Sequence, residues 1–472
     1  MQTKEIKQLN LDLSGKAAVY LLKLKDYTDL EELNISYMNL QIEQQQEQSE
    51  ILDQTLKLPT LQKLKAYQCQ LQTLSFLKNL SLLKYLDLHL NQLTDIQPIQ
   101  NLLYLEYLNL SANPIGSIQM LLPLKHLQQL LISSTQTQSL KGVENMKDLI
   151  ILDAQNNKIE LIDELGGLLN LQDVNLSRNK LQNIVGLTDS INLEQLNIQN
   201  NKLQNLDGLP NYSKLCCLQG GNNKIYDLQL SGYSPKLENL SLVEGELQSL
   251  DGIEKLPKLQ YLYLYKNKLK SIKQLMQLQY LSQLLVFRNQ IESIDGIQYL
   301  NNLVSLDISF NKVTSLKPIE NLPKLQTLIA NNNQLTSLEG VYNCQQLQLL
   351  YVNNNKISNL YVKGVDNLKE IQIYNNNIHD LRQLLFYQNM KNLKRLWLSG
   401  NDNDPICLYS FYKSYVTKIL PQVMSFEYQI DYNTRAENKI DILFDRTQLD
   451  LNQQFPIDTE LTEELSLFLQ KQ

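Results

Sequence analysis

The chain has 472 residues, and 43 lysines and arginines against 49 aspartates and glutamates give it a formal net charge of -6. This acidic balance argues against a nucleic acid or an anionic membrane as the partner, because both select basic surfaces. We also expect no membrane span or secretion signal, because the sequence lacks the long apolar segment that either would need.

The five cysteines are odd in number and scattered along the chain, which does not predict a disulfide framework. We therefore expect reduced thiols and a cytoplasmic monomer, with the nucleus or the cilium as further possible compartments.

Residues 1–60 read as one or more degenerate repeats, with Met38 at the position that asparagine holds later in the chain. They include the glutamine-rich insertion Gln41 to Glu50, which we interpret as a solvated loop, with a binding segment as the alternative.

Residues 61–403 form a regular array in which Leu-x-x-Leu-x-Leu-x-x-Asn-x-Leu recurs every 22 residues. Cys69, Thr135 and Gly245 take the asparagine position without breaking the spacing. The asparagines of this column are Asn91, Asn113, Asn157, Asn179, Asn201, Asn223, Asn267, Asn289, Asn311, Asn333 and Asn355, with an irregular continuation to Asn376 and Asn401.

Each repeat predicts one short strand, because residues such as Leu262 and Leu264 alternate with Tyr261, Tyr263 and Tyr265. The asparagine amide can satisfy backbone groups where each strand ends, and the few residues that return the chain favour 3₁₀ or single helical turns. The predicted fold is an α/β solenoid, a leucine-rich repeat horseshoe with a parallel concave sheet of about seventeen strands and short helical turns on the convex side.

Residues 404–430 leave the period and predict a cap, because a helix over about 408–420 would place an apolar stripe across the last coil. The segment resembles the C-terminal cap of intracellular eukaryotic leucine-rich repeat proteins: phosphatase regulators, spliceosomal A-prime and axonemal dynein light chains. Tyr412, Val416, Leu420 and Pro421 carry this resemblance. We expect residues 431–472 to pack on the cap, with a detachable peptide for a partner as the alternative.

We find no catalytic constellation and predict that the protein is not an enzyme and holds no metal or cofactor. The three histidines lie many repeats apart, and so do Asp87, Asp153 and Asp307.

The outward residues of the strands give the candidate site, because a long series of them is apolar or aromatic. The main stripe comprises Tyr261, Tyr263, Tyr265, Leu285, Phe287, Ile329, Leu349, Tyr351, Tyr374 and Trp397. A second patch near the start comprises Tyr67, Tyr85, Asp87, His89 and Tyr107. The alternative for both is that a tyrosine-rich composition scatters these residues without selection.

The leading functional hypothesis is a non-enzymatic scaffold that holds a folded protein on its concave face. The family resemblance implies a protein phosphatase 1 regulatory-type subunit or, alternatively, a ciliary or cytoskeletal component similar to axonemal dynein light chain. The candidate partners are accordingly a phosphatase catalytic subunit or an axonemal protein. An internalin-like surface adhesin, which also uses 22-residue repeats, is a further alternative.

Overall fold

The computed structural model describes residues 10–17, 20–21, 24, 27, 29–38, 48–209, 214–228, 234–320, 322–399, 405 and 412–427. The chain forms two compact units, Met1–Gly245 and Glu246–Gln472. We describe each unit by itself, as unit 1 and unit 2.

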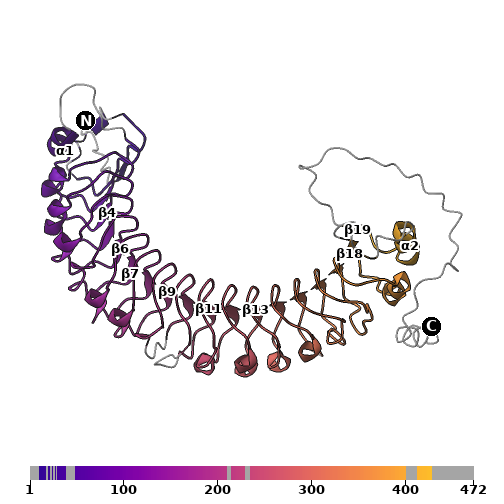
Figure 1. Ribbon diagram of the computed structural model, residues 1–472. Helices are drawn as coiled ribbons and strands as arrows, with labels where there is room; N and C mark the ends of the chain where they lie inside the picture. Colours follow the sequence, from indigo (N-terminus) through magenta and orange to yellow (C-terminus); the bar gives the residue numbers. More distant parts are fainter. Residues whose placement is uncertain are drawn as a thin grey trace. The chain divides into compact units, whose positions relative to one another are not determined.

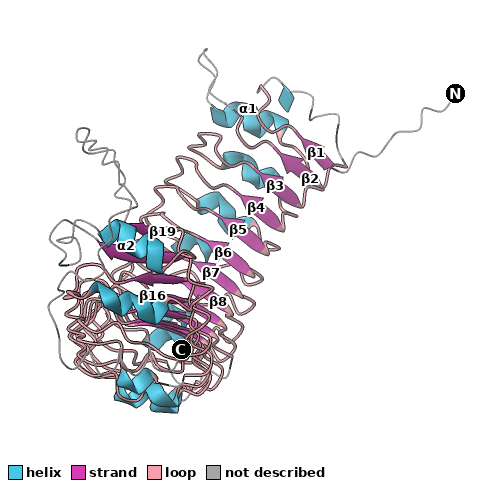
Figure 2. Cartoon of the chain, turned by 90° about the vertical axis from the view of Figure 1, so that its right-hand side faces the viewer, coloured by secondary structure: helices cyan, strands magenta, loops and turns pink. Residues whose placement is uncertain are grey.

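Unit 1 contains a sheet in which every strand pairs in parallel and in register with the next one along the chain. Figure 2 shows the first eight of these strands side by side. The strands are β1 (Asn10–Asp12), β2 (Glu32–Asn34), β3 (Lys63–Lys65), β4 (Tyr85–Asp87), β5 (Tyr107–Asn109), β6 (Gln129–Leu131), β7 (Ile151–Asp153), β8 (Asp173–Asn175), β9 (Gln195–Asn197), β10 (Cys217–Gln219) and β11 (Asn239–Ser241).

Unit 2 repeats the arrangement, again with parallel pairing between successive strands. Its strands are β12 (Tyr261–Tyr263), β13 (Gln283–Leu285), β14 (Ser305–Asp307), β15 (Thr327–Ile329), β16 (Leu349–Tyr351), β17 (Glu370–Gln372), β18 (Arg395–Ser399) and β19 (Ser425–Glu427).

Short helical turns return the chain between strands, and Figure 1 draws them on the side opposite the strands of their own unit. The α-helices are α1 (Gln48–Thr55) and α2 (Tyr412–Ile419). The 3₁₀ turns are η2 (Ser75–Asn79), η3 (Gln97–Asn101), η4 (Gln119–Leu121), η5 (Asp163–Leu165), η6 (Val185–Leu187), η7 (Ile253–Lys255), η8 (Lys273–Gln277), η9 (Ile297–Tyr299), η10 (Lys317–Ile319) and η11 (Leu381–Tyr387). The predicted solenoid fold, with a parallel sheet and 3₁₀ turns, is therefore confirmed.

The core lies between the strands and the turns and is built from the repeated leucines. The central residue of a strand and the residue two positions later are fully buried, as Leu262 and Leu264 illustrate. Because one repeat is too thin to enclose these side chains, each repeat depends on its neighbours for burial.

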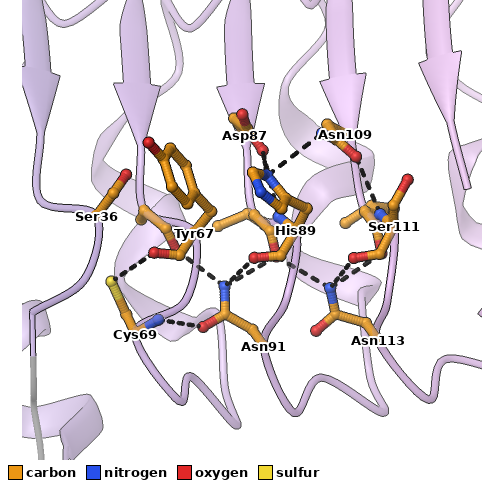
Figure 3. Close-up of polar contacts among 12 residues, drawn as sticks. Ser36, Tyr67, Cys69, Asp87, His89, Asn91, Asn109, Ser111 and Asn113 are labelled. Carbon is orange, nitrogen blue, oxygen red and sulfur yellow. Dashed lines mark hydrogen bonds and ion pairs between the residues drawn. The ribbon is translucent and has the colours of Figure 1, made fainter. Parts of the chain in front are cut away.

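The asparagine column forms a ladder of hydrogen bonds that runs past the C-terminal ends of the strands, as Asn113 shows. Its side-chain carbonyl accepts the Leu93 N–H at 3.0 Å, and its amide donates to the carbonyls of Leu88 and Leu110, each at 2.9 Å. The side chain is only 1% exposed. One asparagine therefore satisfies backbone groups of its own repeat and of the preceding one (Figure 3).

Cys69 and Thr135, which hold the asparagine position in their repeats, take part in the same ladder. The Cys69 thiol donates to the Ile35 carbonyl at 3.1 Å, and the Thr135 hydroxyl donates to the Ile132 carbonyl at 2.9 Å. Gly245 has no side chain to contribute, and unit 1 ends at this residue.

The residue before each ladder position has a left-handed backbone. Asn156, Asn200, Asn332 and Asn354 are typical, with φ between 54° and 57°. Asparagine tolerates this conformation better than most residues. We call this series the left-handed row.

A second row of asparagines, which the sequence analysis did not predict, lies just before the strands. Their side-chain amides donate to backbone carbonyls of the preceding repeat. In unit 1, Asn170 and Asn192 donate to the Lys147 and Leu169 carbonyls at 2.9 and 2.8 Å. In unit 2, Asn302 makes the equivalent bond to the Gln279 carbonyl at 2.7 Å.

The structure differs from the sequence prediction at both ends of the array. The sheets include β1, which precedes the first predicted repeat, and β19, which follows the cap helix. The insertion was predicted to be a loop, but its last three residues begin α1 at Gln48. Residues 41–47, Asn401 and the tail 431–472 lie outside the described residues.

Within the described residues the cap helix α2 spans Tyr412–Ile419, and the first part of the predicted helix, residues 408–411, lies outside them. Helix α2 packs on η11 through its buried face, which includes Tyr415 and Val416. The Gln422 side-chain amide then donates to the Tyr387 carbonyl at 3.0 Å. These contacts cover apolar side chains of the last coils, which is the role expected of a cap.

Replacing Asn113 by alanine should lower the free energy of unfolding by about 1–3 kcal/mol, because it leaves buried backbone groups without partners. Denaturant titration of the full chain measures this change. Asn101→Ala is the matched control, because Asn101 is exposed at the end of η3. Equal stability of the two variants would contradict the role given to the ladder.

Val416→Asp should destabilise unit 2 by about 3 kcal/mol or more, because it places a charge without a partner under the cap. Thermal unfolding followed by limited proteolysis should show loss of the last repeats first. Thr417→Asp, one residue along on the exposed face of α2, should have little effect. If both variants unfold alike, α2 does not act as a cap.

Candidate protein-binding face

Strand alternation sets out the solvent-facing side chains of each sheet in rows, and we call this face the concave face of its unit. In unit 2 the register places Tyr261 beside Gln283, and Tyr263 beside Leu285. Because the pairing stays in register from β12 to β18, equivalent residues of successive repeats are neighbours on this face.

The first group of predicted residues is the proximal cluster, Tyr261, Tyr263, Tyr265, Leu285 and Phe287. The Tyr265 and Phe287 rings stack with centroids 4.4 Å apart and planes 8° apart. The Tyr263 hydroxyl donates to the Gln283 side-chain carbonyl at 3.0 Å. Tyr261 is 40% exposed, so the cluster presents aromatic surface to solvent.

The second group is the distal cluster, Ile329, Leu349, Tyr351, Tyr374 and Trp397. Beside Leu349 and within hydrogen-bonding distance of Trp397 lies a buried carboxylate that sequence analysis did not select, that of Glu370, which is 5% exposed.

Three side chains hold this carboxylate. The Trp397 indole N–H donates to it at 3.1 Å, the Gln372 amide donates at 2.8 Å, and Arg395 forms an ion pair with it at 2.5 Å. Burial and the Glu370 charge together raise the pKa of Tyr351. The distal cluster is therefore an apolar surface that contains one fixed carboxylate, Glu370, whose charge is neutralised by Arg395.

Strand β14 divides the predicted stripe into these two clusters. It places Ser305 and Asp307 outward, and the register sets Asp307 between Leu285 and Ile329. Burial raises the pKa of Asp307, while its hydrogen bond from the Ser309 N–H, at 2.9 Å, opposes the shift.

The second predicted patch lies in unit 1 and consists of two aromatic stacks. Tyr67 and His89 stack with centroids 4.3 Å apart, and Tyr85 and Tyr107 with centroids 4.1 Å apart. His89 Nδ1 lies 2.7 Å from the carboxylate of Asp87, which is almost fully buried (Figure 3). Burial raises the pKa of both Tyr85 and Tyr107.

Many outward aspartates and asparagines of unit 1 have a structural role that the sequence did not reveal. Each is the last residue of its strand, and its side chain accepts the N–H of the residue two positions later, as Asp153 does from Gln155 at 3.1 Å. The set is Asp12, Asn34, Asp87, Asn109, Asp153, Asn175 and Asn197. We call these residues the acceptor row. In unit 2, Asp307 makes the same contact.

The other candidates for chemistry stay apart in the structure. His126 pairs with Asp148 on the surface, and burial raises the pKa of the Cys216 and Cys217 thiols, which disfavours the reactive thiolate. Among the described residues, no group of three or more His, Cys, Asp or Glu side chains is placed to hold a metal ion. In the same part of the chain, no helix has the length and apolar character needed to cross a membrane.

Two further surface residues were missed, Phe310 and Arg288. Both belong to the left-handed row, with φ of 54° and 56°. The position before each ladder asparagine could have identified them, because asparagine is common there and phenylalanine is not.

The repeats, ladder and sheet define a leucine-rich repeat protein. The family model "Leucine Rich repeats (2 copies)" matches residues 323–363. None of the curated proteins matches the sequence.

Several solved structures share the fold. A leucine-rich repeat protein of Leptospira interrogans is 26% identical, with a TM-score of 0.61 over 85% of this chain and 91% of that one. The Arabidopsis receptor kinase HAESA, in complex with the peptide hormone IDA and the co-receptor SERK1, is 19% identical, with a TM-score of 0.59 over 82% and 68% of the two chains. The plant peptide hormone receptor RGFR1, in complex with RGF2, is 18% identical, with a TM-score of 0.58 over 84% and 69%.

Asp307→Asn should stabilise unit 2 at about pH 7 and lose this advantage at about pH 3. The raised pKa means that ionisation of Asp307 is less favourable in the folded state, and this penalty disappears once the group is protonated in both states. The amide oxygen can still accept the Ser309 N–H. Thermal unfolding across this pH range measures the effect.

Asp12→Asn is the control of opposite sign, because hydrogen bonds from Ser14 lower the pKa of Asp12. Its carboxylate stabilises the fold above the ordinary aspartate pKa, and that contribution is lost as the pH falls through the folded-state pKa. A stability gain for both variants at neutral pH would contradict this account.

Proposed function

We propose that this protein is a non-enzymatic scaffold that binds a folded protein partner on the concave face of unit 2. The observation that carries the proposal is a replacement in the acceptor row. Of the eleven strands described in unit 1, seven end in the aspartates and asparagines of this row, and Leu131 is the one apolar residue at that position. Unit 2 places Tyr263, Leu285, Ile329, Tyr351 and Trp397 at the equivalent positions, with Asp307 and Gln372 as the polar exceptions.

The replacement has a physical cost. An aspartate or asparagine at this position accepts a backbone N–H, a hydrogen bond that contributes about 0.5–1.5 kcal/mol. Tyrosine, leucine and tryptophan cannot make the same local contact and leave apolar surface in water. Composition alone would scatter such residues over both units, so their concentration in unit 2 supports a binding role.

The distal cluster has the make-up of a binding hot spot. Trp397, Tyr351 and Arg395 are of the residue types that dominate binding energies at protein interfaces. The hydrogen bond and ion pair to Glu370 hold the indole and the guanidinium in place, so little side-chain freedom remains to be lost on association.

The shared fold supports the class of function and no single partner. HAESA and RGFR1 carry the same fold and were solved with bound partners. The cap resemblance motivates two candidate partners for this chain, a protein phosphatase 1 catalytic subunit and an axonemal protein. Tyr412, Val416 and Leu420, which carry the resemblance, are buried as a cap requires.

Affinity purification of the tagged protein with mass spectrometry tests the partner directly. Recovery of a phosphatase catalytic subunit would favour a regulatory subunit, and axonemal proteins would favour the ciliary component. Each candidate then has to be purified and shown to bind the full chain directly.

The combined change Tyr263→Ser, Phe287→Ser, Tyr351→Ser and Trp397→Gln should weaken binding of the purified partner strongly. At least one single change should cost about 2 kcal/mol or more, about 30-fold in Kd. Glutamine at 397 keeps an N–H donor for Glu370, so the melting temperature should change little. Isothermal titration calorimetry and thermal unfolding measure the two effects.

The control is Lys317→Ser with Glu320→Gln, on the turn side of unit 2, which should leave affinity unchanged. If the quadruple variant binds as tightly as the parent, the aromatic residues of this face do not contact the partner.

A further inference from the structure

The distal cluster lies beside the last strand of the described chain. Because β19 pairs with β18, Glu427 is set beside Ser399, two residues from Trp397. The chain continues from Glu427 into residues 428–472. Covalent linkage gives any suitable part of these residues an effective concentration on the order of millimolar at the cluster, so even a weak contact would be populated.

Two exposed lysines stand at the rim of the distal cluster. Lys369 and Lys394 directly precede β17 and β18, and they are neighbours because the Lys394 N–H donates to the Lys369 carbonyl at 2.9 Å. The Lys369 ammonium donates to the neutral Gln348 side chain at 2.8 Å, and neither lysine has an ion pair with another described residue. Glu427 lies at the opposite ends of the strands.

The other charges at this rim cancel in pairs. Arg395 is paired with Glu370. Lys391 lies next to Asp366, because the Asn392 side-chain amide donates to the Asp366 carbonyl at 3.0 Å. The two remaining lysines make the rim of the distal cluster basic, although the whole chain is acidic.

The chain beyond β19 contains a segment of complementary chemistry, residues 457–469, which we call the acidic segment. It has no lysine or arginine. Its carboxylates are Asp458, Glu460, Glu463 and Glu464, and its large apolar residues are Ile457, Leu461, Leu465, Leu467, Phe468 and Leu469. Residues 428–456 mix five acidic with three basic residues and fit the rim less well. These 29 residues can span about 95 Å, which exceeds the roughly 15 Å over which β15 to β18 stack.

We propose that the acidic segment binds the distal cluster of its own chain. Phe468 and the leucines beside it pack on Trp397, and the carboxylates face Lys369 and Lys394. Burial of apolar surface supplies the affinity, and the opposite charges fix the position. A thirteen-residue segment covers less of the concave face than a folded protein does, so the partner can displace it. The contact itself goes beyond the proposed function, and its regulatory consequence, competition with the partner, rests on that function.

The fluorescence of Trp397 reports on this contact in the full chain, because it is the only tryptophan. Leu467→Ser with Phe468→Ser should shift its emission to longer wavelength and raise acrylamide quenching by about twofold or more, because the indole then faces water. The matched control is Leu443→Ser with Phe444→Ser, the same residue types outside the acidic segment, which should change neither quantity. Both variants should keep the parent melting temperature.

A synthetic peptide of residues 457–469, added to the Leu467→Ser and Phe468→Ser variant at millimolar concentration, should reverse both fluorescence changes. Its effect should weaken by about 0.5 M NaCl, because exposed charges are screened. The same peptide with its four carboxylates replaced by amides should act only at higher concentration. Reversal that is equal for the two peptides would contradict the charge contacts.

Carbodiimide cross-linking of the full chain, which joins carboxylates to amines in contact, locates the acidic segment. It should join carboxylates of the segment to Lys369 or Lys394 within one molecule. Cross-links to Lys418 of α2 alone would place the segment on the cap, as the sequence analysis expects, and would overturn the inference. Unchanged Trp397 emission in the Leu467→Ser and Phe468→Ser variant would overturn it as well.

Failure of this inference can be separated from failure of the proposed function. If Trp397 emission is unchanged in the segment variant while the quadruple variant loses the purified partner, the concave face binds the partner and the segment contact alone is wrong. If the emission shifts while the quadruple variant binds normally, the segment contact holds and the proposed function is wrong. When both hold, the segment variant should bind the partner about threefold or more tightly, because the competing contact is gone.

Discussion

The asparagine ladder is the contact on which the rest of the structure depends. Wherever a strand ends, the chain must turn sharply inside a packed stack, and its backbone groups would be buried without partners. An amide side chain offers an acceptor and two donors in one place, and Asn113 uses them to join its own repeat to the preceding one. With the turns secured in this way, successive strands stay in register and the leucines stack behind them.

That register also determines which residue types each outward position favours. The last residue of a strand can accept the N–H two residues later, and the residue before the ladder must adopt a left-handed backbone. Both positions favour aspartate or asparagine for local reasons, as Asp153 and Asn332 illustrate. Trp397 and Phe310 depart from these preferences. In the acceptor row such departures are concentrated in unit 2, whereas the left-handed row departs from asparagine in both units, with Leu90 and Tyr37 in unit 1.

Sequence periodicity was sufficient for the repeat, the ladder and the faces of the strands, because each depends on residue type at a fixed spacing. It was insufficient where tertiary contacts decide. Strand β1 forms by pairing with β2 although only Leu11 and Leu13 of its segment match the repeat pattern, and β19 forms by pairing with β18.

Glu370 illustrates the same limit at the candidate site. It appeared to be an ordinary outward polar residue, and only its contacts with Trp397 and Arg395 reveal a buried carboxylate at the centre of an aromatic cluster. The division of the stripe at Asp307 was readable from the sequence, but its meaning required the register.

Hydroxyl-radical footprinting of the full chain, with and without its purified partner, tests the central claim most directly, because aromatic side chains react strongly with the radical and report their own exposure. We predict protection of Tyr263, Phe287, Tyr351 and Trp397 in the complex. Tyr280 and Tyr299, which are 49% and 48% exposed on the turns of the same unit, should react equally in both states. Protection of Tyr280 and Tyr299 with no change at the concave residues would contradict the account.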